Sequence, residues 1–332
     1  MPSQAFSQPV FDLFSFARRG PGRRDHLSPG EVQQVARTVR CTPEVMVKIL
    51  SKSASSLATV KKHLEYIGRR GDLDLETDDG ERLKGTGIDK ALVEDWDLEL
   101  DEYRRKSDLT ATHGKEPARL VHKAIFSMPA GTPPEKVLMA VKNFAREEFA
   151  LKHRYVMALH TDTPRPHVHV VIKAVSEQGQ RLDIRKATLR AWRAEFARHL
   201  RAVGVAANAT PRSVRGQIDL GKPDKIYRAN LRGESTFMRE RVEGIKLALA
   251  KVDLPLNAAD SRLAETRIKV QRAWTVVGDI LLSEGQPDLA KQVRYFADTM
   301  PRAVTEKQQL ASAIRASTTV RTRDARQTHR SR

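Results

Sequence analysis

Residues 154–175 read RYVMALHTDTPRPHVHVVIKAV, and this stretch organises the rest of the chain. Residues 155–160 are apolar up to a final histidine, residues 167–174 begin with alternating histidine and valine, and a proline-bearing segment separates the two runs. This pattern predicts two strands joined by a turn. Because successive side chains on a strand point to opposite faces, His167 and His169 share one face, and an antiparallel hairpin brings His160 close to them.

Three imidazoles that converge from neighbouring strands predict a site for a divalent metal ion, because neutral imidazole is a good ligand for most first-row metals. Asp162 lies between the histidines in the sequence. Its carboxylate is a candidate to orient one of them, since metal-bound histidines usually donate their second N–H to an acceptor. Taken singly, a histidine in a strand is more often a half-buried polar residue; three within ten residues favour the metal site.

The composition indicates an ordinary globular protein with an unusual charge. Of 332 residues, 40% are apolar and 30% are charged, and the formal net charge is +18. So large an excess favours a polyanionic partner, nucleic acid or an anionic membrane surface, over charge that serves solubility alone. Cys41 is the single cysteine, which excludes a disulfide framework and a cysteine zinc site and favours a reducing, cytoplasmic setting. No apolar run is long enough to cross a bilayer, so membrane insertion is not expected.

The order of predicted elements gives an α+β fold. The elements alternate between strands or hairpins and helices, which predicts an antiparallel sheet with flanking helices. They are a strand at 44–50, a helix at 57–70, a hairpin turning at Asp79-Gly80, a helix at 88–103, a strand at 119–128, a helix from Pro133 to about 149, the histidine hairpin, a short strand at 181–184 and a helix at 186–203.

Composition also divides the chain into four parts. Residues 1–41 are rich in Pro, Gly and Arg and are expected to form a disordered or weakly ordered extension, with one short helix after Ser28. The α+β domain is expected over 42–217, followed by a helical C-terminal region over 218–316 with helices at 234–251, 258–284, 287–299 and 305–314. Residues 317–332 form a basic tail that is expected to be disordered.

Tyr66 is a candidate nucleophile. It follows His63 and precedes a Gly-Arg-Arg sequence at the expected end of the 57–70 helix, where a phosphate could be held. A metal that polarises a phosphate oxygen needs such an attacking group, either water or a side chain that forms a covalent intermediate. Structural tyrosines are far commoner than nucleophilic ones, so position alone leaves both readings open.

Three segments resemble one known family. HTDTPRPHVHVV (160–171), SMPAGT (127–132) and HLEYIGRRGDLDL (63–75) closely resemble conjugative DNA relaxases, in the branch that includes the T-DNA border endonuclease. These proteins belong to the wider class of His-hydrophobic-His nucleases. The resemblance covers about residues 44–217 and implies a relaxase-type nuclease fold there.

The resemblance implies roles for the candidate residues. Tyr66 falls on the nucleophile that attacks a phosphodiester at a transfer origin and forms a 5′-phosphotyrosyl intermediate, which starts conjugative or mobilisation transfer. His160, His167 and His169 fall on the metal-binding histidines, with Mg²⁺ or Mn²⁺ as the expected ion, and Asp162 falls on an acidic position that assists the tyrosine or holds a histidine. Two alternatives stay open: a rolling-circle replication initiator of the same nuclease class, and a non-catalytic DNA-binding or secreted partner protein.

One position departs from the family pattern. Similar proteins carry Asn four residues after the last histidine, where this chain has Lys173. His122, near the second matching segment, is a weaker candidate for the site. Basic residues expected to follow a DNA backbone are Arg69, Arg70, Arg154, Arg165, Lys173, Arg185 and Arg212.

The resemblance also implies partners and a location. The expected partners are single-stranded DNA at a transfer origin, relaxosome accessory proteins, and a type IV secretion coupling protein that recognises the Arg-rich tail. The protein is expected in the cytoplasm, with translocation to a recipient cell as a DNA conjugate.

Overall fold

The structure is a computed structural model, and it describes residues 11–18, 24–50, 56–111, 119–218, 224–250 and 258–317. The chain forms two compact units, one containing residues 40–209 and one containing residues 12–39 together with residues from 210 onward. The expected boundary at residue 217 therefore lies inside the second unit.

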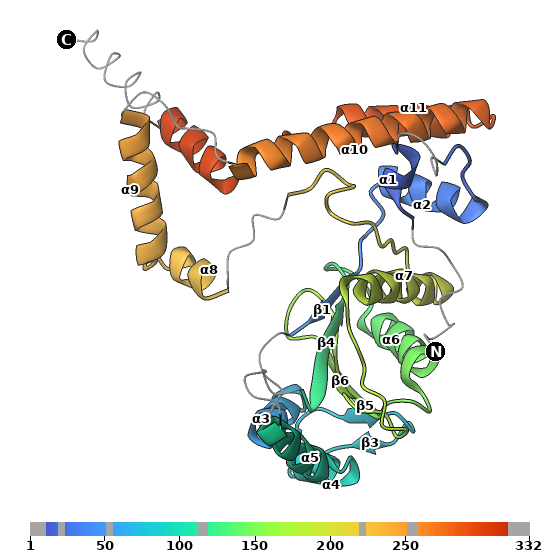
Figure 1. The fold of residues 1–332 in the computed structure, drawn as a ribbon, viewed down its shortest axis with the longest axis vertical. Helices are drawn as coiled ribbons and strands as arrows, with labels where there is room; N and C mark the ends of the chain where they lie inside the picture. The colour runs from blue at the N-terminus through green and yellow to red at the C-terminus, as the bar shows by residue number, and fades with distance from the viewer. Residues whose placement is uncertain are drawn as a thin grey trace. The chain divides into compact units, whose positions relative to one another are not determined.

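A six-stranded sheet is the centre of the first unit (Figure 1). Its strands lie in the order β1-β4-β6-β5-β2-β3, and each neighbouring pair is antiparallel. The α+β prediction with an antiparallel sheet is confirmed. The strands are β1 (Met46–Ile49), β2 (Leu75–Thr77), β3 (Arg82–Leu83), β4 (Val121–Ser127), β5 (Tyr155–His160) and β6 (His167–Lys173).

Two helices cover one face of the sheet: α6 (Pro134–Phe149) and α7 (Lys186–Ala202) (Figure 1). Their apolar stripes pack on the strand residues of that face, and aromatic rings fill the layer between. The ring of Phe126 lies 4.9 Å from Phe144 and 5.3 Å from Phe196, centroid to centroid. This layer holds the larger apolar core and keeps the central strands rigid beneath the site on the opposite face.

The opposite face is covered by α3 (Leu57–Ile67), with α4 (Ile88–Asp95) and α5 (Leu98–Ala111) beside it. Val60, Leu64 and Ile67 recur at helical spacing and are buried in one cluster with Val156 and Val171 of the sheet. Since side chains alternate along a strand, His160 lies on the same face as Val156, and His167 and His169 on the same face as Val171.

The end of α3 has an uncommon backbone. Ser56 caps its start, and Gly68 ends it. Arg69 and Arg70 then adopt left-handed conformations, with φ of 52° and 57°, in the short 3₁₀ turn Arg69–Gly71. Such conformations are costly for residues other than glycine and concentrate at functional sites. Gly71 has φ of 100°, and a Cβ there would lie 2.5 Å from the backbone of Gly85, so only glycine fits.

The described part of the second unit is helical, which confirms the predicted helical C-terminal region. Its helices are α1 (Leu13–Phe16), α2 (Pro29–Val39), α8 (Asp224–Leu231), α9 (Thr236–Ala250), α10 (Ala258–Ser283), α11 (Pro287–Asp298) and a further helix over residues 306–317. None of the described helices combines the length and apolar character needed to cross a membrane. The basic tail expected over 317–332 lies, except for residue 317, outside the described residues.

The expectation of a weakly ordered extension over residues 1–41 is wrong for the part that the structure describes. Helix α2 begins after Ser28 as predicted, but α1 packs against α10, and α2 packs against α11. Leu13, Phe16 and Val35 are fully buried. Residues 1–41 contain few apolar side chains, but those of α1 and α2 pack against helices from the far end of the chain. A local sequence pattern does not show such contacts.

Two smaller predictions also need correction. The helix expected over 88–103 is two helices, α4 and α5, because Asp97 adopts a left-handed conformation with φ of 49° between them. The strand expected at 181–184 is reduced to one isolated bridge between Val175 and Arg181.

Candidate metal and nucleophile site

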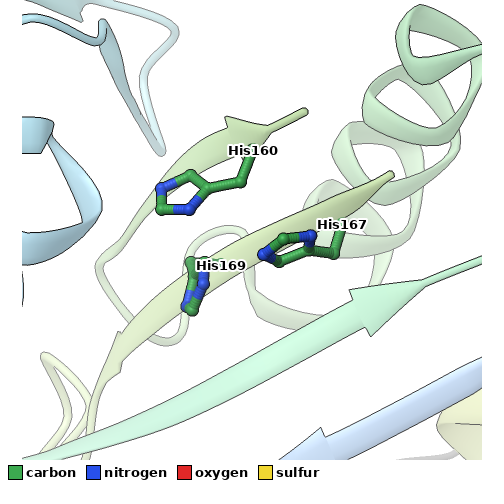
Figure 2. A group of neighbouring side chains, drawn as sticks. All are labelled: His160, His167 and His169. Carbon is green, nitrogen blue, oxygen red and sulfur yellow. The ribbon is translucent and has the colours of Figure 1, made fainter. Parts of the chain in front are cut away.

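The hairpin of β5 and β6 brings the three histidines together. His160 lies directly opposite His167 in the strand register, and His169 follows two residues along β6 (Figure 2). The ring of His160 lies 4.6 Å from that of His169 and 5.3 Å from that of His167, between centroids. One ligand nitrogen of each lies within 4.8 Å of those of the other two. These separations allow one ion to contact all three.

Two of the imidazoles are oriented by backbone carbonyls. His160 Nε2 lies 2.8 Å from the carbonyl oxygen of Ile67, at the end of α3. His167 Nδ1 lies 3.1 Å from the carbonyl oxygen of Arg165, in the turn before its own strand. Because a carbonyl can only accept, each of these nitrogens is the N–H donor, and the other ring nitrogen keeps a lone pair.

His169 supplies an unpaired nitrogen inside the site. It is 3% exposed, and its Nδ1 is buried without a hydrogen-bond partner among the described residues. Burial first, and then the neighbouring imidazoles of His160 and His167, lower the pKa of His169 to about 3. The ring is therefore neutral at physiological pH. A buried, neutral and unpaired imidazole beside two others fits a metal ligand.

The donor set consists of nitrogen alone. Within the described residues, the group that could hold an ion here comprises the three histidines and no carboxylate. Imidazole suits iron, nickel, copper and zinc, whereas magnesium and manganese prefer oxygen donors. The ligands therefore do not single out the expected Mg²⁺ or Mn²⁺, and water or phosphate oxygens would have to complete the sphere of either ion.

Tyr66 lies against the histidine cluster. Its ring centroid is 6.0 Å from that of His160 and 5.8 Å from that of His169. The residue is 52% exposed, which is high for so large a ring. Tyr66 comes from the last turn of α3, and the packing of that helix on the sheet positions it. The phenol is thus beside the candidate metal ligands and open to a substrate.

Arg69 connects the remaining groups. Its guanidinium donates to the Asp162 carboxylate, lies 3.3 Å from His160 Nδ1, and is 5.6 Å from the centroid of the Tyr66 ring. Slight burial raises the pKa of Asp162, but the hydrogen bond and charge of Arg69 outweigh it, and the pKa is lowered. Asp162 therefore orients Arg69. The role of orienting a histidine, which was one of the two expected for Asp162, is not what the structure shows.

His63 is a neighbour that the sequence analysis did not assign to the site. It lies one helical turn before Tyr66, stacks on that ring at 6.0 Å, and is 5.9 Å from His169. Its Nε2 is buried without a partner among the described residues. Burial, and then the charges of Lys123 and His160, lower its pKa to about 4. The i, i+3 spacing of His63 and Tyr66 was the available signal.

Three of the seven basic residues expected on DNA, Arg154, Lys173 and Arg185, are held in ion pairs away from the histidine cluster. Arg154 pairs with Asp78 at 2.9 Å and with Asp95 at 2.7 Å, at the end of β5 away from His160. Lys173 is 7% exposed, with its ammonium 3.6 Å from Glu177. Lys173 pairs with Val121 in the strand register, beyond His169, so it does not enter the histidine cluster.

The basic candidates also differ in position. Arg165 is exposed in the turn beside His167, and Arg70 is exposed next to Arg69. Arg185 is also exposed but pairs with Asp183 at 2.6 Å, just before α7 on the other face of the sheet. Arg212 belongs to the second unit.

His122 is excluded from the cluster. It points to the face of the sheet that α6 and α7 cover, with Nε2 3.2 Å from the carbonyl oxygen of Leu182.

Comparison with known proteins gives two findings. Residues 66–204 match the family model of the MobA/VirD2-like relaxase nuclease domain. The chain is also 27% identical over 146 residues to the T-DNA border endonuclease VirD2 of Rhizobium radiobacter. That alignment covers 39% of this chain and 31% of the relative, so it spans about a third of the relative's length.

Proposed function

We propose, from the match of residues 66–204 to the MobA/VirD2-like relaxase nuclease domain, that the chain nicks one strand of DNA at a specific site to start conjugative or mobilisation transfer. The observation that carries the proposal is the position of Tyr66, exposed and against the rings of His160 and His169. A phenol open to substrate beside three convergent imidazoles supports nucleophilic attack at phosphorus.

The reaction is a transesterification. The Tyr66 oxygen forms a bond to the scissile phosphorus, the bond from phosphorus to the 3′ oxygen breaks, and the phenol proton leaves to a base. The departing 3′ oxygen takes up a proton, and the 5′ end stays on Tyr66 as a phosphotyrosine. One phosphoester bond replaces another, so the reverse step can rejoin a strand.

The three histidines would hold a divalent ion, which supplies Lewis-acid stabilisation of charge on the non-bridging phosphate oxygens. His160 and His167 are fixed for this by the carbonyls of Ile67 and Arg165. The buried ring of His169 is neutral at physiological pH, so it can bind an ion without first losing a proton. The chain itself thus orients two of the three rings and keeps the third neutral.

Arg69 and Asp162 are proposed to manage charge at the same centre. A guanidinium beside Tyr66 and His160 can stabilise both the developing phenolate and the phosphate oxygens. Asp162 keeps that guanidinium in place by accepting its hydrogen bond. In the resting protein Arg69 lies at His160 Nδ1, the nitrogen left free for an ion, so an ion at that nitrogen requires Arg69 to shift toward the substrate.

The substrate is proposed to be single-stranded DNA at a transfer origin. Arg165, exposed in the turn beside His167, is the best placed of the basic residues to contact backbone phosphates, and Arg70 is exposed four residues after Tyr66. The net charge of +18 favours such a substrate. Relaxosome proteins and a type IV coupling protein are the partners that a transfer role requires. The protein would act in the cytoplasm and travel with its strand.

The decayed, non-catalytic alternative finds less support. Its motive was Lys173 at a position where similar proteins carry Asn. Lys173 is buried beside Glu177 beyond the histidine cluster, so it leaves the three imidazoles and Tyr66 in place. A replication initiator would use the same chemistry, and no contact in the described residues favours it.

A cleavage assay tests the proposal. A labelled single strand carrying the transfer origin is incubated with protein and Mn²⁺, Mg²⁺ or Zn²⁺ and resolved on a denaturing gel. The wild type is expected to give a protein–DNA adduct, and Tyr66→Phe none. Tyr103→Phe is the matched control, since Tyr103 is an exposed tyrosine on α5 and should leave the adduct unchanged. An adduct that survives Tyr66→Phe would contradict the assignment.

A further inference from the structure

A surface hollow of about 350 Å³ lies beside the end of α3. Its apolar lining comes from Leu64, Leu75 and Ile88, and its polar lining includes Arg70, Thr86 and Asp89. The volume is within the range of small-ligand sites, about 300–1,000 Å³. None of the histidines of the nuclease site lines it, so it is a separate feature of the same unit.

The charged residues that line the hollow are Glu65, Arg70 and Asp89, and the last two make no ion pair with the residues that the structure describes. Asp89 is 8% exposed, and its carboxylate makes no hydrogen bond or ion pair with any residue that the structure describes. The same holds for the guanidinium of Arg70 within the described ranges. The side chain of Asp89 is largely covered, but its carboxylate oxygens reach solvent in the hollow and can accept hydrogen bonds there. A ligand with N–H donors would supply what Asp89 lacks.

Glycine backbone forms part of the wall. Gly85 and Gly87 line the hollow with φ of 106° and 85°, and a Cβ at either position would meet nothing within 4 Å. Their peptide groups are therefore uncovered by side chains. A flat ring can lie against such a surface and against the apolar side chains below it.

The hollow is one residue away from the nuclease site. Arg69 turns toward Tyr66, His160 and Asp162, whereas its neighbour Arg70 lines the hollow. The consecutive left-handed conformations of the two arginines separate their side chains in this way. Glu65, which also lines the hollow, directly precedes Tyr66 in α3, so a strand whose phosphate lies at Tyr66 passes beside the hollow.

We propose that this hollow binds one nucleobase of the strand being nicked, next to the scissile phosphate, and that guanine fits it best. Guanine offers N–H donors on one edge to Asp89 and the O6 and N7 acceptors on another to Arg70. The inference rests on the proposed nicking function and adds a site of sequence recognition to it. A thymine, with one N–H donor, would leave more of the carboxylate unpaired.

Selection from a randomised pool of single-stranded DNA tests this. Tyr66→Phe, which binds without cleaving, is used as the parent protein, and bound strands are sequenced. The parent should enrich guanine at one position by about 5- to 150-fold over the disfavoured bases, the usual range for a bidentate base contact. Thr86→Trp fills the hollow, and Asp89→Asn removes the negative acceptor. Thr132→Trp, in the turn before α6, is the matched control.

The expected result is loss of preference at that single position in Thr86→Trp and a weakened guanine preference in Asp89→Asn, with other enriched positions kept and the control unchanged. Unchanged preferences in both variants, or no enriched position in the parent, would overturn the nucleobase site. Failure of the nicking function itself is distinguishable, because wild-type protein would then form no covalent adduct with the selected strands, whatever base they carry.

Discussion

Acid should destabilise the first unit (residues 40–209) through its buried histidines, and His122 allows this to be tested outside the histidine cluster. Burial lowers the pKa of His122 to about 4 and that of His169 to about 3, from an ordinary value of 6.5. Both residues are at most 8% exposed. Since the folded rings stay neutral while the unfolded rings accept protons, this stability is present above pH 6.5 and is lost as pH falls toward the folded pKa.

The magnitude follows from linkage. One pKa unit corresponds to about 1.4 kcal/mol. A pH of 5 lies about 1.5 units below the pKa of an imidazole in the unfolded chain. Each buried histidine should therefore lower the free energy of unfolding by about 2 kcal/mol between pH 7 and pH 5. The two together give about 4 kcal/mol, a large part of the stability of a typical domain.

The assay is urea unfolding at pH 7 and pH 5, in wild type and His122→Leu. Both proteins carry Trp274→Phe, so that fluorescence reports Trp96 and Trp192 of this unit. The variant loses a hydrogen bond to Leu182 at both pH values, and that cost cancels in the comparison. The variant should lose about 2 kcal/mol less than wild type between the two pH values. An equal loss in both proteins would refute the reasoning.

Three further predictions concern ligand binding and backbone strain. His169→Gln should weaken the binding of Mn²⁺ or Zn²⁺ by more than tenfold in isothermal titration calorimetry, whereas His122→Gln should bind as wild type does. Equal binding by wild type and both variants would show that the three histidines do not hold the metal. Arg165→Ala should reduce the slope of log binding constant against log salt concentration for single-stranded DNA by about 0.7. Arg154→Ala should leave that slope unchanged and lower the melting temperature, because Arg154 pairs with two aspartates. The reverse pattern would contradict the assignment. Gly71→Ala should lower the free energy of unfolding by about 2 kcal/mol or more, measured in urea, because its φ is 100° and a Cβ would meet the Gly85 backbone; a neutral effect would show that the turn can relax.

The hairpin and its histidines could be predicted from the sequence because they depend on local rules. Alternation sets the faces of two adjacent strands, and a short turn sets their register, so His160, His167 and His169 had to meet. The approach of Tyr66 depends on how α3 packs on the sheet across a long sequence separation. No periodicity shows that packing, and only the family resemblance indicated it.

The residues whose surroundings sequence reasoning did not predict have partners far along the chain. The sequence predicts Arg154 as a DNA contact. In the structure it pairs with Asp78 of the β2–β3 turn and with Asp95 of α4. Conversely, Arg69 was expected on DNA, and its packing against Asp162 and His160 adds a role at the nucleophile. Charge alone cannot separate a basic residue that is paired from one that is available.

The most direct test of the account is to locate the bond between protein and DNA. Wild-type protein is allowed to cleave its origin strand, the adduct is digested with nuclease and trypsin, and the nucleotide-bearing peptide is sequenced by mass spectrometry. Cleavage after Lys62 and Arg69 gives the peptide of residues 63–69. The account predicts a nucleotide phosphate on Tyr66 within that peptide. A nucleotide on any other residue, or cleaved DNA with no peptide attached, would contradict it.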